Sequence, residues 1–354
     1  MKGETLLVGS MPSRSTGEAL ETFGGALGPY LASLPDGEVG WRQFWITGVH
    51  IGVFAIHPDL EVIERPRRED GIECMIPHDA TDNWNFRVRE GVERVTFGHP
   101  GRRLGYYQEA VNSYDVFRRL KAQGCLPDGL RFQVSIPTSV SALPPRVFPV
   151  PGDLEKVRPG YIEAARAEIA AITREIPSQE LAIQWDCATE LQDAYGAVEG
   201  LPPEAMVKRN LDHIAALSGD IPSAVLLGFH LCFGTLGGWP RFKVDSLDRA
   251  VLLANAIIEV AGRRVDWVHL PLLARMDDAY YAPLAELAPG DTRIYLGMIH
   301  NMETLAERLS FARRYLKDFG VAAYCGFGRR TSSDVAEILK DHMTAVDLLR
   351  RQGG

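Results

Sequence analysis

Residues 224–231 read AVLLGFHL and residues 265–272 read VDWVHLPL, and between them residues 246–261 repeat apolar side chains with a helical period. The two outer runs are short and apolar, as is typical of strands buried on both faces. A buried strand, a helix and a second buried strand make one βα repeat around a parallel sheet. This stretch therefore predicts an α/β fold built on parallel strands.

The same alternation extends in both directions from this stretch. The predicted strands are 5–10, 31–36, 131–137, 181–186, 224–231, 265–272, 293–299 and 321–327. The predicted helices in the carboxyl-terminal part are 155–176, 203–218, 246–261, 302–318 and 332–351. Eight strands in this order are the number that a closed (β/α)8 TIM barrel requires. We therefore predict one such barrel over residues 1–354.

Residues 40–130 interrupt the alternation. The apolar periodicity there is weak, and a hairpin near 92–97 is the clearest local pattern. Strands are predicted on both sides of this region, so an independent domain is less plausible than an excursion from the barrel. We predict an insertion that covers the barrel mouth.

Composition narrows the class of function. The chain has 354 residues, 46% of them apolar, and a net charge of −8 with Lys and Arg spread along the sequence, which argues against a nucleic-acid surface. No apolar run reaches the ~18 residues that span a bilayer, and the amino terminus lacks a signal-peptide pattern. We expect a cytoplasmic protein with small-molecule partners, and the sequence is compatible with a homo-oligomer. Five widely separated cysteines favour metal or thiolate chemistry over a disulfide framework.

Polar residues gather at the carboxyl ends of the predicted strands, where a TIM barrel places its active site. These candidates are Gly9, Ser10, Asp36, Glu38, Asp186, Glu190, His230, Cys232, His269, His300 and Cys325. Because they follow nearly every predicted strand, packing alone explains them poorly.

His230 and Cys232 form a His-x-Cys pair at one strand end. In an extended chain, residues i and i+2 point the same way, so both side chains can reach one ion. Cys325 ends the last strand beside Gly326, which permits a close backbone approach. Two thiolates and one imidazole suit zinc and leave a fourth position open, although buried structural cysteines remain the alternative.

These segments resemble the catalytic barrel of cobalamin-independent methionine synthase, in a superfamily shared with uroporphyrinogen decarboxylase. The quoted motifs are Leu7-Val8-Gly9-Ser10-Met11-Pro12, Gln184-Trp185-Asp186, His230-Leu231-Cys232 and Tyr324-Cys325-Gly326. The resemblance implies that His230, Cys232 and Cys325 bind zinc. It also implies that Gly9 and Ser10 hold a substrate amino acid and that Asp186 takes its ammonium group.

Two departures from that family limit what the resemblance implies. The family has a glutamate zinc ligand at the end of the strand that corresponds to 265–272, and this chain has none there. His269 could replace it, water or substrate could fill the position, or His269 could be a satisfied core residue. The family's synthase also uses a second barrel for its folate donor, and we expect 354 residues to hold only one. Methylfolate is therefore a doubtful alkyl donor.

The remaining candidates have open alternatives. Asp36 and Glu38 either bind the substrate or belong to an ordinary turn. Arg329 either binds an anion or lies at a basic helix start. Glu190 and His300 are the candidate proton donors to a leaving group.

The expected function is zinc-dependent transfer of an alkyl group to or from a thiol, or related cleavage or formation of a C–S bond. The partners would be a thiol and an alkyl donor or other electrophile. One alternative is a metal-free decarboxylase or lyase on the uroporphyrinogen decarboxylase barrel. The other is a barrel that binds a ligand without turnover.

Overall fold

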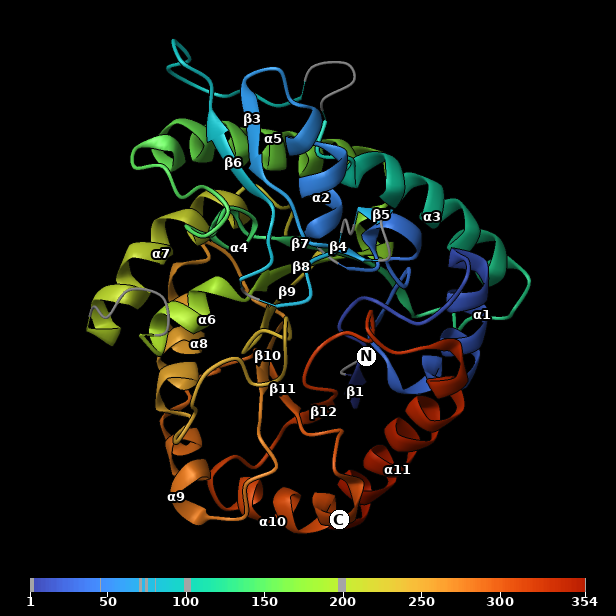
Figure 1. Cartoon of the computed structure of the whole chain (residues 1–354). Helices are drawn as coiled ribbons and strands as arrows, with labels where there is room; N and C mark the ends of the chain where they lie inside the picture. Colours follow the sequence, from blue (N-terminus) through green and yellow to red (C-terminus); the bar gives the residue numbers. More distant parts are fainter. Residues whose placement is uncertain are drawn as a thin grey trace.

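The computed structural model describes residues 3–44, 46–69, 72–73, 76–79, 81–98, 103–196 and 202–353. One 8-stranded parallel sheet, ordered β1-β12-β11-β10-β9-β8-β7-β2, curls into a nearly closed barrel (Figure 1). Its strands are β1 (Thr5–Leu6), β2 (Ser33–Pro35), β7 (Arg131–Pro137), β8 (Leu181–Cys187), β9 (Leu226–Leu231), β10 (Trp267–Pro271), β11 (Arg293–Gly297) and β12 (Gly320–Ala322). The predicted TIM barrel is confirmed.

The barrel is joined between β1 and β2 by isolated hydrogen bonds. The amide of Met11 donates to the carbonyl of Gly37 at 2.8 Å. Inside the barrel, the side-chain amides of Gln133 and Gln184 donate to the carbonyl of Val8 at 3.1 and 2.7 Å. These bonds fix the end of β1, from which the Gly9–Ser10 segment leaves.

Helices form an outer ring around the strands (Figure 1). They are α1 (Thr16–Leu27), α3 (Tyr106–Ala122), α5 (Asp153–Glu175), α7 (Pro203–Ser218), α8 (Asp248–Val260), α10 (Leu305–Tyr315) and α11 (Val335–Gly353). The ring closes because α11 contacts both α10 and α1. Helix α1 begins after Ser15, whose hydroxyl accepts a hydrogen bond from the amide of Glu18 at 3.1 Å and so caps the first turn.

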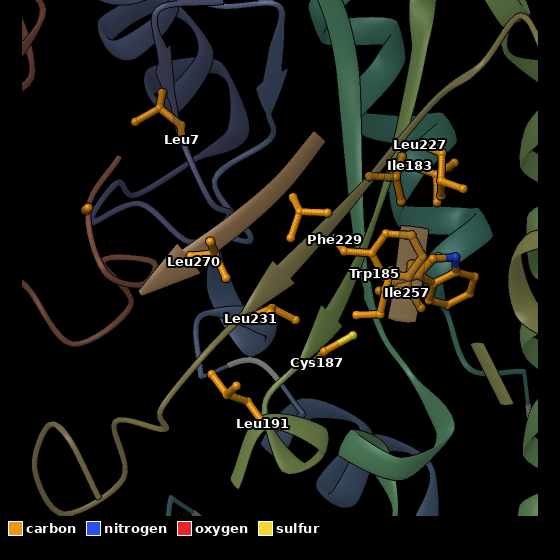
Figure 2. Close-up of a cluster of buried hydrophobic side chains, with 14 of the residues drawn as sticks. Leu7, Ile183, Trp185, Cys187, Leu191, Leu227, Phe229, Leu231, Ile257 and Leu270 are labelled. Atoms are coloured by element: carbon orange, nitrogen blue, oxygen red, sulfur yellow. The ribbon is translucent and has the colours of Figure 1, made fainter. Parts of the chain in front are cut away.

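Alternation along the strands separates the core from the site. Ile183, Trp185 and Cys187 of β8 join the core under the helices, together with Leu227, Phe229 and Leu231 of β9 (Figure 2). The intervening residues therefore face the barrel interior. At Gly228, an added Cβ would lie 1.8 Å from the Trp267 ring, so this bulky interior side chain requires a glycine opposite it. Near the carboxyl ends, the interior positions are Asp186 and His230.

The segment between β2 and α3 folds over the carboxyl ends of the strands, as predicted. It contains α2 (Thr47–Gly52) and two antiparallel pairs, β3 (Leu60–Glu64) with β6 (Asn85–Val88) and β4 (Arg68–Glu69) with β5 (Ile72–Glu73). We call residues 43–83 of this segment the lid. The predicted hairpin near 92–97 is wrong, because the pairing involves β3 and β6 instead.

The insertion also ends earlier than predicted, because α3 belongs to the barrel ring. Helix α3 packs against α1, α5 and β7. The buried face of α3 includes Ala110, Ser113 and Tyr114. Because these side chains are small or carry a hydroxyl group, the apolar periodicity of this helix is weak in the sequence. Among the described residues, no helix is both long and apolar enough to cross a membrane.

Candidate functional site

A cavity opens at the carboxyl ends of the strands, beneath the lid. It holds roughly 1000 Å³ of atom-free space that is continuous with solvent at its mouth. Eight of the residues predicted from the sequence line it: Gly9, Ser10, Glu38, Asp186, His230, Cys232, Cys325 and Arg329. The other predicted residues, Asp36, Glu190, His269 and His300, lie outside its lining.

His230, Cys232 and Cys325 converge at this cavity. Their donor atoms all lie within 4.8 Å of one another, and the two sulfurs are 3.5 Å apart. Two sulfurs at tetrahedral positions around zinc would be about 3.8 Å apart, since each Zn–S bond is about 2.3 Å long. The two sulfurs therefore need to move apart by only about 0.3 Å to hold one zinc ion.

The two cysteines differ in acidity. A hydrogen bond joins the sulfurs of Cys232 and Cys325, and it lowers the pKa of Cys232 and raises that of Cys325. The amide of Gly234 also donates to the sulfur of Cys232 at 3.3 Å. Cys232 is therefore the more acidic of the two thiols, and the thiolate is the form that binds metals.

His269 lies behind His230 and does not join the donor group. In the parallel register, His230 is opposite His269, and their Nδ1 atoms are 2.7 Å apart. The Nε2 of His269 lies 3.0 Å from the carbonyl of Ala323, which only accepts, so this nitrogen carries the hydrogen. Burial lowers the pKa of His269 to about 4, so the ring is neutral and its Nδ1 can accept the Nδ1 hydrogen of His230. This leaves Nε2 of His230 as the nitrogen available to a metal.

Glu38 enters the cavity from the turn after β2. Its φ of 48° is unusual for a residue with a side chain and places the carboxylate against the Gly9 backbone, where an added Cβ would be 2.8 Å from Oε1. Burial raises the pKa of Glu38 to about 7, Asp36 adds to the rise, and Arg42 and a hydrogen bond from Ser10 oppose it.

Asp36 supports this turn from outside the cavity. The guanidinium of Arg42 binds both of its oxygens, at 2.8 and 3.3 Å, and the amide of Glu38 donates to Oδ1 at 2.9 Å. Burial works against the charged carboxylate, yet Arg42 holds the pKa of Asp36 below its ordinary value. The predicted turn chemistry therefore describes the contacts of Asp36.

Asp186 is the next-to-last residue of β8, lines the cavity and lies opposite His230 in the strand register. The side-chain amide of Gln184 donates to its Oδ1 at 2.9 Å. Asp186 and Glu38 are the two carboxylates of the cavity lining, and we call them the acidic wall.

The two predicted proton donors have other partners. Glu190 is fully buried and accepts hydrogen bonds from the hydroxyls of Thr138 and Ser141, the latter at 2.6 Å. Burial raises the pKa of Glu190 to about 7, although the carboxyl lies outside the cavity lining. The Nε2 of His300 lies 2.8 Å from the carbonyl of Leu272, and burial lowers its pKa to about 4. In this arrangement neither side chain faces a bound substrate.

Sequence reasoning missed two arginines that line the cavity. Arg146 follows α4 (Ser139–Ala142), and Arg241 lies in the loop after β9. With Arg329 they form what we call the cationic wall. Both arginines lie in irregular loops well past a strand end, so neither strand position nor periodicity marks them.

No family model and no curated protein sequence matches this chain. Solved structures do resemble it. A B12-independent methionine synthase from Shewanella sp. W3-18-1, in complex with selenomethionine, has a TM-score of 0.62 at 12% identity, over 95% of this chain and 88% of that one. A methyltransferase from Methanosarcina mazei has a TM-score of 0.55 at 9% identity, over 95% and 85% of the two chains. The chain therefore shares the barrel fold of B12-independent methionine synthase structures.

Proposed function

We propose that this protein is an enzyme that transfers an alkyl group to or from a thiol, with a zinc ion held by His230, Cys232 and Cys325. The observation that carries the proposal is the convergence of these three donors within 4.8 Å at a cavity beneath the lid. The methyltransferase and methionine synthase structures with the same fold support it. When bound, zinc supplies the Lewis acidity that keeps a substrate sulfur deprotonated near neutral pH.

The acidic wall would hold the polar tail of the thiol substrate. Asp186 and Ser10 lie beside the donor trio, and a carboxylate there suits an ammonium group. The Shewanella structure binds selenomethionine, an amino acid whose ammonium would match such a wall. The lid, with Phe44 and His50 facing the cavity, would exclude water and hold both partners close together.

The overall change is one C–S bond formed and one bond from carbon to the leaving group broken. The proton of the thiol must leave, and the leaving group gains the electron pair. Glu38 is the cavity carboxyl suited to take this proton and deliver one to the leaving group, since its pKa of about 7 leaves both of its forms populated near neutral pH. It takes the role that the sequence alone suggested for Glu190 or His300.

The test is the metal content of the purified protein together with thiol alkylation. We expect about one zinc per chain in the wild type, and loss of both zinc and turnover in Cys232→Ser and Cys325→Ser with the fold kept. Cys125→Ser, an exposed cysteine away from the cavity, is the matched control and should keep both properties. If Cys232→Ser and Cys325→Ser retain wild-type zinc, the trio is not the metal site. If the wild type itself holds no zinc, the metal-free alternative gains support.

A further inference from the structure

The cavity has a second wall of opposite charge. Arg146, Arg241 and Arg329 line it together with lid residues such as His50. The chain as a whole is acidic, with 46 Asp and Glu against 38 Lys and Arg. Carboxylates that could pair with arginines are therefore abundant. Among the described residues, however, the arginines of this cluster form no ion pair with a carboxylate, and this calls for an explanation.

Arg146 is the clearest member of this cluster. Among the described residues, no carboxylate forms an ion pair with it, and its buried Nε has no hydrogen-bond partner. Burial and then the like charge of Arg241 lower the pKa of Arg146 to about 10. A buried guanidinium that faces another cation is unfavourable unless an anion binds between them.

Arg241 is held in place rather than neutralised. Its side chain lies over Gly234, where an added Cβ would come within 2.6 Å of Cδ, and Nη1 donates to Oε1 of Gln192 at 3.4 Å. The amide of Gln192 in turn donates to the carbonyl of Ala188 at 3.1 Å. Arg241 is thus anchored by neutral groups and keeps its charge available to the cavity.

A role in stabilising thiolates explains part of the cationic wall. Arg241 and Arg329 lie close enough to Cys232 for their charges to interact. Arg329 also donates to the hydroxyl of Thr235. Among the described residues, however, the titratable groups that interact with Arg146 are Arg241 and the neutral His50, not the cysteines. The metal centre therefore leaves Arg146 unexplained.

We propose that Arg146 and Arg241 form a subsite for a compact oxyanion of the substrate, a carboxylate, sulfonate or phosphate. Guanidinium groups bind such anions through two parallel hydrogen bonds. The inference rests on the proposed function, because it assigns part of the same cavity to the same reaction. The oxyanion belongs either to the thiol's tail or to the alkyl partner, and the two walls of opposite charge would orient the substrates relative to each other.

The first experiment titrates zinc-loaded protein with propionate, propanesulfonate and inorganic phosphate at constant ionic strength, with 1-propanol as a neutral probe. We expect at least one anion to bind and the alcohol not to bind. Arg146→Met should weaken anion binding about ten- to a hundredfold, the usual loss for a charged hydrogen-bonded contact. Arg146→Lys keeps the positive charge but not the planar guanidinium group, so it should weaken anion binding less than Arg146→Met does.

The control variant is Arg166→Met, which removes the same charge from an exposed pair with Asp220 on the outer face of α5. It should bind anions like the wild type. The proposal is overturned if Arg146→Met binds all three anions like the wild type, or if Arg166→Met is weakened as much as Arg146→Met. Zinc content measured in each variant separates these outcomes from damage to the metal centre.

A second pair of titrations identifies the source of the oxyanion. If Arg146→Met weakens 3-mercaptopropionate but not 2-mercaptoethanol, the oxyanion belongs to the thiol. If anions still bind when 3-mercaptopropionate saturates the protein, it belongs to the alkyl partner. Both results support the subsite. If the wild type takes up no zinc but still binds the anions, and Arg146→Met weakens that binding, the subsite stands while the proposed zinc chemistry fails.

Discussion

Glu38, in the turn after β2, and Glu190, in α6 (Thr189–Ala194), are both buried. Their pKa values are alike, but they occupy different positions relative to the cavity. Burial raises the pKa of both Glu38 and Glu190 to about 7. Glu38 lines the cavity from a backbone turn with positive φ, whereas both oxygens of Glu190 accept hydrogen bonds from serine and threonine hydroxyls. A raised pKa thus reports burial alone, and access to substrate decides whether it serves catalysis.

The largest expected effect contrasts these two glutamates directly. Glu38→Gln should lower turnover about 100- to 10,000-fold, the usual contribution of general acid–base catalysis. Glu190→Gln should keep turnover within about threefold, because its contacts are internal to the scaffold. Steady-state kinetics on both zinc-loaded variants decides, and a large loss of turnover in Glu190→Gln with wild-type stability would break the comparison.

A second contrast concerns the histidine that orients a ligand. His269→Ala should weaken zinc binding about ten- to a hundredfold, the scale known for partners that orient metal ligands. His269→Gln should lose less zinc affinity than His269→Ala. The glutamine amide can still contact either Ala323 or His230, whereas the histidine ring contacts both. Competition with a chelator measures the affinity. If the histidine is instead a fourth ligand, X-ray absorption would count two nitrogen donors in the wild type and one in both variants.

A third, smaller effect is a pH dependence of stability. The folded-state pKa of Glu190, about 7, exceeds its ordinary value of 4.5, so the folded chain binds more protons than the unfolded chain between these values. The stabilisation is complete below pH 4.5 and is lost as pH rises toward 7, by at most about 1.4 kcal/mol per pH unit. The free energy of unfolding, measured with urea at several pH values in this range, should fall less steeply with rising pH in Glu190→Gln than in the wild type. An unchanged slope would mean that Glu190 is charged in the folded state.

Much of the barrel follows from sequence because each repeat carries its own signal. The run 131–137 matches β7 in full, where Phe132, Val134 and Ile136 alternate with polar residues as expected of a strand. The point at which a strand stops pairing does not always follow from the sequence. The predicted strand 5–10 pairs only over Thr5–Leu6, because an apolar run does not reveal where the ladder of hydrogen bonds stops.

The donor trio could be predicted for a similar reason. Carboxyl ends of parallel strands meet at one face, so His230, Cys232 and Cys325 must approach each other once the barrel closes. The same rule does not predict which way a side chain turns after the strand ends. His300 turns toward Leu272, and Arg146 reaches the cavity from a loop whose course depends on packing against the lid.

The smallest expected effect concerns His300, whose ring makes edge contacts with the stacked rings of Trp239 and Tyr324, with centroids 5.2 and 5.5 Å away. Its Nε2 lies 2.8 Å from the carbonyl of Leu272, so it carries a hydrogen, and a pKa of about 4 leaves the ring neutral near pH 7. A neutral, engaged imidazole outside the cavity has no proton to deliver. His300→Gln, whose amide can donate to the same carbonyl, should therefore keep turnover within about threefold and leave the pH profile of kcat unchanged, while Glu38→Gln removes the limb near pH 7. If His300→Gln instead shifts or removes that limb, His300 moves the proton and the structure has captured it in a resting orientation.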